Sequence, residues 1–153
     1  MHIRRHCVTT LLSMLLLSCS ALNSQADTEY QRYIKHKKIW QSLAWEDYEY
    51  STARQCYCLA LLTKEMQIGI KDGRPVYAHL VEDNDSLNAL LIKKLYSIDQ
   101  WFEFIGNGFA RKADHLEVEY HPEYGYPQKI EVDFRRARAD DEHVVWIYEV
   151  RPR

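Results

Sequence analysis

The chain has 153 residues and a formal net charge of −2, with 20 lysines and arginines against 22 aspartates and glutamates. This length suits one domain with a single hydrophobic core. The slightly acidic balance argues against a nucleic-acid-binding protein, because such a protein needs a basic face. We therefore expect no nucleic-acid partner.

The first eighteen residues have the composition of an export signal. Arg4 and Arg5 give a basic start, and residues 8–17 are almost entirely apolar. The apolar run is too short to span a bilayer as a helix, so a signal peptide is the better interpretation. Residues 16–18 (Leu-Leu-Ser) directly before Cys19 resemble a bacterial lipobox, in which the chain is cleaved before the cysteine and the cysteine is acylated.

Two processing schemes stay open for this segment. In the first, acyl chains on Cys19 anchor the protein to a membrane. Ser20 is not the aspartate that retains lipoproteins at the inner membrane, so this scheme predicts an outer-membrane lipoprotein facing the periplasm. In the second, a cleavage motif ends at Ala26 and a soluble periplasmic protein begins at Asp27. The lipobox scheme gives a signal over residues 1–18, a tether over 19–28 and one domain over 29–153.

Apolar residues at helical spacing predict two amphipathic helices. The first covers residues 28–43, where Tyr33 and Trp40 belong to the apolar stripe. The second begins after Ser97, which forms a capping box with Gln100 three positions on. Its apolar stripe contains Ile98, Trp101, Phe102, Ile105 and Phe109.

Alternating apolar and polar residues predict strands between and after these helices. The segment 143–150 is apolar on both parities, which is typical of a strand at the centre of a sheet. Residues 82–95 fit either a loop or a short helix. The expected fold is α+β, one antiparallel sheet with helices on one face, in the order αβββ-αβββ. The other expected strands cover residues 48–58, 66–70, 76–80, 116–120 and 130–134.

Cys56 and Cys58 are the cysteines that remain after processing, apart from Cys19. An exported protein meets an oxidising compartment, which favours a disulfide between them. Residues two apart in a regular strand lie about 6.6 Å from each other at Cα, near the upper limit for a disulfide. A disulfide would therefore require the strand to bulge or end at Tyr57. A thiol-redox pair and a metal-binding pair are the alternatives.

Four carboxylates gather around the last expected hairpin. They are Asp133, Asp140, Asp141 and Glu142. Clustered carboxylates are ligands for calcium, although a solvated turn with arginine partners is the simpler interpretation. His115 and His121 lie about 20 Å apart along one strand, so they cannot share a metal ion.

The segment Tyr124, Gly125, Tyr126 and Pro127 predicts a turn before the following strand. Gly125 can adopt a positive φ there, and proline can fix the start of the returning strand. The tyrosine rings would offer a binding patch if they were exposed.

Three segments resemble the bacterial domain of unknown function 6174 family of exported proteins, many of them lipid-anchored. The first ends in the two cysteines around Tyr57, the second opens the helix after Tyr96, and the third contains the turn at Gly125 and the acidic residues that follow. These segments cover residues 45–58, 96–102 and 119–142. The resemblance spans roughly residues 40–150 and implies a small exported domain without an assigned activity.

The sequence contains no Gly-x-Ser-x-Gly motif and no glycine-rich phosphate loop. We therefore expect a non-enzymatic, lipid-anchored cell-envelope domain without a cofactor. It would bind or support a protein partner in the envelope through its aromatic strands and turn. The alternative is a periplasmic thiol-redox or metal-binding protein that uses Cys56 and Cys58.

Overall fold

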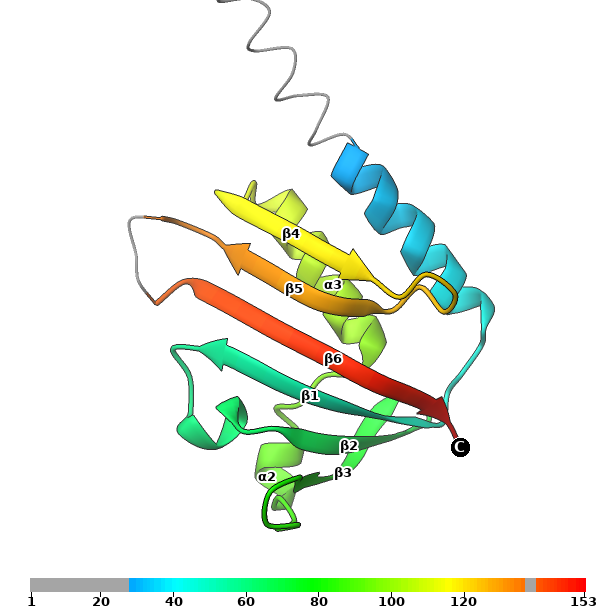
Figure 1. Ribbon diagram of the computed structural model, residues 1–153, viewed down its shortest axis with the longest axis vertical. Coiled ribbons are helices and arrows are strands. Elements are labelled where there is room, and N and C mark those ends of the chain that lie inside the picture. Colours follow the sequence, from blue (N-terminus) through cyan, green and yellow to red (C-terminus); the bar gives the residue numbers. More distant parts are fainter. Residues whose placement is uncertain (1–27, 137–139) are drawn as a thin grey trace, which may run out of the picture. The chain divides into compact units, whose positions relative to one another are not determined.

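The structure is a computed structural model that describes residues 28–136 and 140–153 (Figure 1). Its contacts divide the chain into two units, Met1–Ile34 and Lys35–Arg153. The described part of the first unit is helical, and Glu29 pairs there with Arg32 at 2.7 Å. The helix extends over residues 28–42, so the helix expected over 28–43 is confirmed.

The second unit contains one six-stranded antiparallel sheet in the order β3-β2-β1-β6-β5-β4. Each half of the sheet is a three-stranded meander, and β1 pairs with β6 where the halves meet. The apolar segment 143–150 therefore lies in a central strand, as its sequence predicts. The strands are β1 (Tyr48–Cys56), β2 (Met66–Lys71), β3 (Arg74–Leu80), β4 (His115–Tyr120), β5 (Pro127–Asp133) and β6 (Glu142–Pro152).

Three helical elements of this unit come after β1. The 3-10 helix η1 (Ala60–Thr63) follows β1, and α2 (Ala89–Ile92) and α3 (Ile98–Ala110) lie between β3 and β4. The order αβββ-αβββ is thus confirmed, with η1 and α2 as short additions. No helix in the described part of the chain is both long and apolar enough to cross a membrane.

The helix α3 packs against one face of the sheet, which we call the covered face; in Figure 1 it passes behind the strands. Its start is fixed by the capping box at Ser97 and Gln100 and by Tyr48 of β1, whose Oη accepts a hydrogen bond of 2.8 Å from the Ile98 N–H. Residues 35–42 of the first helix lie on the same face, since Trp40 contacts Tyr48 edge-on at 5.2 Å between ring centroids. Alternating strand residues such as Tyr48 are fully buried between these layers.

The strand side chains of opposite parity point away from α3 and form the open face. Glu117 of β4 and Glu131 of β5 lie on this face, and so do Trp146 and Tyr148 of β6. Each is at least partly exposed. The sheet therefore has one packed face and one face available for contacts.

Candidate functional site

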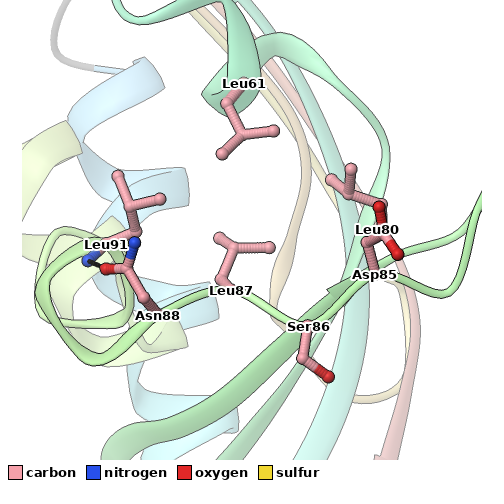
Figure 2. A pocket seen from close by; sticks show the side chains of 7 residues that line it. All are labelled: Leu61, Leu80, Asp85, Ser86, Leu87, Asn88 and Leu91. Carbon is pink, nitrogen blue, oxygen red and sulfur yellow. Dashed lines mark hydrogen bonds between the residues drawn. The ribbon is translucent and has the colours of Figure 1, made fainter.

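A hollow of about 250 Å³ lies between η1, the end of β3 and α2 (Figure 2). Figure 2 shows Leu61 of η1 opposite Leu87 and Leu91, with Leu80 of β3 on a third side. The polar side chains on its wall are Asp85, Ser86 and Asn88.

Backbone pairing and a helix cap hold the wall of this hollow formed by residues 85–91 in place. The Leu80 N–H donates to the Asp85 carbonyl at 2.9 Å, and the Leu87 N–H donates to the Ala78 carbonyl at 2.8 Å. Residues 85–87 therefore run beside β3 and protect part of its edge. Asn88 caps α2, since its Oδ1 accepts hydrogen bonds from the N–H groups two and three residues ahead. Both arrangements orient leucines toward the hollow.

The residues that flank the lining leucines in sequence carry exposed apolar side chains. Leu90, next to Leu91, is 75% exposed, and Val81, next to Leu80, is 50% exposed. Leu59, two residues before Leu61, is 52% exposed. The sequence predicts a loop or short helix over residues 82–95 but does not predict this apolar surface. The surface depends on how η1 packs against residues 81–88.

Cys56 and Cys58 are joined by a disulfide, with their Cα atoms 5.3 Å apart. The strand β1 ends at Cys56, so the chain leaves extended geometry at Tyr57, as a bridge between these two positions requires. Tyr57 itself is 85% exposed. In this oxidised form neither sulfur is a thiolate, so neither can act as a nucleophile or as a metal ligand.

The turn that contains Tyr124, Gly125, Tyr126 and Pro127 packs against residues 35–42 of the first helix. Gly125 has a φ of +75°, and a Cβ at this position would lie 2.6 Å from the His36 carbonyl oxygen. Tyr126 is 5% exposed and Pro127 is buried. Tyr124 is half-buried, and its ring stacks on His121 at 4.9 Å. Of the two rings proposed for a binding patch, only that of Tyr124 reaches solvent appreciably.

The four carboxylates considered for calcium lie around the connection between β5 and β6. Asp133 and Glu142 face each other across these strands. One oxygen of Asp133 accepts a hydrogen bond of 2.9 Å from the Arg135 N–H. Asp140 is exposed and Asp141 is half-buried.

Among the residues that the structure describes, converging metal-ligating atoms occur instead in His115, Glu117 and Glu131. The Nε2 atom of His115 lies 3.7 Å from Oε2 of Glu131. Lys129 forms an ion pair with Glu131, and this ammonium group is the main cause that lowers the pKa of Glu131. Spacing along one strand shows that His115 and His121 cannot bind the same metal ion. It does not reveal that a carboxylate on the neighbouring strand, Glu131, lies beside His115.

A half-buried cationic group lies at the edge of the covered face. Arg54 of β1 lies over the Trp101 ring, 5.4 Å from its centroid, and its Nε and Nη2 atoms have no hydrogen-bond partner in the described part of the chain. Burial lowers the pKa of Arg54. Burial, together with the Arg54 charge, also lowers the pKa of His143 on β6. The environment therefore favours the neutral form of His143.

Comparison with known proteins places the chain in a family. No curated protein and no solved structure matches it. The model of a family of unknown function (DUF6174) matches residues 32–152, which is more than three quarters of the 153 residues. This match confirms the resemblance seen in the cysteine segment, the second helix and the turn. The chain therefore belongs to the family of unknown function DUF6174.

Proposed function

We propose that this protein is a non-enzymatic, lipid-anchored domain of the cell envelope that binds a protein partner through the leucine-lined hollow. The observation that carries the proposal is the apolar surface around this hollow. Leu59, Val81 and Leu90 are each at least 50% exposed and lie one or two residues from lining residues in the sequence. We take these side chains and the hollow together as one interaction surface, because exposed apolar patches are typical of interaction sites.

The size of the hollow favours a protein partner over a small-molecule substrate. Its volume of about 250 Å³ is below the range of roughly 300–1,000 Å³ that is usual for small-molecule sites. An apolar side chain of a partner is a better match, and its burial stabilises a complex by about 1.5–3 kcal/mol. Asp85, Ser86 and Asn88 would form the polar rim that surrounds such an anchor.

The proposed membrane anchor is Cys19, which lies outside the described residues. Attachment to a membrane surface would raise the local concentration of the domain for partners on the same membrane. The disulfide between Cys56 and Cys58 is consistent with an exported protein, since disulfides persist in oxidising compartments.

Site-specific photo-crosslinking in intact envelopes tests the partner surface. A photoreactive residue replaces Leu90 in the full-length protein, and the matched control replaces Glu103, which is exposed on α3. We expect an adduct of higher mass from position 90 but not from position 103, and Leu61→Glu should abolish it by placing a charge in the hollow. Monomer alone from position 90, or the same adducts from both positions, would contradict the proposal.

Cys19→Ser tests the anchor separately. We expect the wild-type protein to incorporate radiolabelled palmitate and to sediment with membranes, and the variant to do neither. Palmitate incorporation that is absent from the wild type, together with an N-terminus at Asp27, would instead establish the soluble form.

A further inference from the structure

The register between β4 and β5 brings an imidazole and two carboxylates together on the open face. Glu117 lies directly opposite Glu131, and His115 lies two residues before Glu117, on the same side of β4. Directly opposed residues in an antiparallel pair have Cβ atoms only about 4.5–5.5 Å apart. One donor atom from each of the three side chains lies within 4.8 Å of the others.

The distances require little rearrangement for a shared metal ion. Two ligands on a tetrahedral zinc ion lie about 3.4 Å apart, given bond lengths of about 2.0–2.2 Å. The Nε2 atom of His115 and Oε2 of Glu131 are already 3.7 Å apart. These side chains are 41% and 32% exposed, so rotation about their side-chain bonds can close the remaining gap.

The donor set selects among metals. One imidazole nitrogen with two carboxylates is a set of three protein ligands that leaves a fourth position for water, as in open zinc sites. Calcium and magnesium prefer oxygen ligands alone, so the histidine disfavours both.

A second observation is a hollow of about 170 Å³ beside the same residues. His115 and Glu131 line it together with Asp133 and Glu142. Because a water molecule occupies about 30 Å³, this space holds several waters. Carboxylates around a metal site commonly accept hydrogen bonds from its ligands, and Asp133 and Glu142 lie beside this one.

Lys129 competes for the same site. Its ammonium group pairs with Oε1 of Glu131, while Oε2 is the oxygen nearer to His115. A bound cation would share Glu131 with Lys129 or displace it. Removing the ammonium group should therefore strengthen metal binding and leave the three ligands intact.

From these contacts we infer that His115, Glu117 and Glu131 form a binding site for one divalent transition-metal ion, with zinc as the metal that the donor set fits best. This site is on the open face of β4 and β5 and is independent of partner binding at the leucine-lined hollow.

Titration calorimetry of the full-length, tag-free chain in detergent with Zn²⁺ tests the site. We expect one ion per chain, and a loss of affinity of about 100-fold or more in His115→Ala and in Glu131→Gln, because even groups that only orient a ligand contribute about 10–100-fold. Glu131→Gln keeps the size of the side chain, so its fold should be intact, which circular dichroism checks. Lys129→Gln should bind about 2–5-fold more tightly, in proportion to the strength of a surface ion pair.

His79→Ala is the matched control, since His79 lies on β3 at the far edge of the sheet. We expect it to bind Zn²⁺ as the wild type does, and Co²⁺ to give a visible absorption band in both proteins but not in His115→Ala. Absence of stoichiometric binding to the wild type would overturn the inference. Equal losses of affinity in His115→Ala and His79→Ala would do so too, because they would indicate adsorption to surface histidines.

Discussion

The two faces of the sheet are held by different forces. On the covered face, Tyr48, Phe102 and Ile130 are fully buried, and apart from the hydrogen bond at the Tyr48 hydroxyl they pack through apolar or aromatic surface. On the open face, Lys129 and Glu131 are each 32% exposed and interact mainly through charge. Burial of apolar surface stabilises a fold by about 1.5–3 kcal/mol per large side chain, whereas exposed ion pairs contribute about 0–1 kcal/mol.

Because of this difference, the residues that determine the stability of the fold are not the residues that are available for binding. Changes on the covered face should alter folding, because the buried side chains there fill space between the sheet and the helices. Exposed residues of the open face and around the leucine-lined hollow can vary with little effect on stability, whereas the buried lining residues Leu80 and Leu87 belong to the core. Residues with a binding role are therefore best sought where the fold does not require them.

The largest expected effect is that of Phe102→Ala, which truncates a ring that stacks on Tyr120 at 6.3 Å. Removing a fully buried aromatic side chain leaves a cavity, so we expect a loss of about 3–5 kcal/mol in the free energy of unfolding. Glu119→Ala, at an exposed position of β4, should change it by less than about 0.5 kcal/mol. Urea denaturation measures both, and similar losses in the two variants would contradict the contrast between the faces.

The next effect compares two glycines with positive φ in different surroundings. A methyl group added at Gly125 would lie 2.6 Å from the His36 carbonyl oxygen and 2.9 Å from the Ile39 Cβ, whereas one added at Gly73 would have no atom within 4 Å. Gly73→Ala should cost only the backbone strain of about 1–2 kcal/mol. Gly125→Ala adds overpacking and should cost about 2–5 kcal/mol in all.

Thermal or urea denaturation of both variants checks this pair. Equal destabilisation would mean that the turn does not pack against residues 35–42 of the first helix. The partial burial of Tyr124 would then need another explanation. A larger loss for Gly125→Ala extends the contrast between packed and open surfaces to the loops.

Sequence spacing predicts the covered face well, because burial imposes a period on the chain. The stripe from Ile98 to Ile105 specifies α3, and the box at Ser97 and Gln100 specifies its start. Hydrogen bonds of 3.3 Å to Ser97 Oγ and 2.8 Å to Gln100 Oε1 confirm that box. Local hydrogen bonding and amphipathic spacing involve residues that are close in the sequence, so both can be predicted without knowledge of the fold.

The binding surfaces depend on register and packing, which the spacing does not contain. The pairing shifts between Glu119 opposite Lys129 and Tyr120 opposite Pro127. Counting back from the turn without this irregularity would place Glu117 opposite Ile130, with the wrong side chain facing the open side. The histidine–glutamate cluster therefore cannot be derived from the turn alone, and the leucine-lined hollow likewise requires η1 to lie beside residues 85–91.

The smallest expected effect concerns His143, at the edge of the covered face, where its ring contacts Phe104 edge-on at 5.7 Å. Burial and, second, the charge of Arg54 lower its pKa below the ordinary 6.5, while Asp141 opposes the shift. As the pH falls through about 6.5, the unfolded chain takes up a proton at this histidine before the folded one does, so the folded state loses stability. Above this pH both states are neutral at His143, and its contribution is constant.

The midpoint of urea denaturation should therefore fall less between pH 7.5 and 5.5 in His143→Gln than in the wild type. Identical falls would mean that His143 is as free to ionise in the fold as in the unfolded chain, and that the packed face does not extend to this edge.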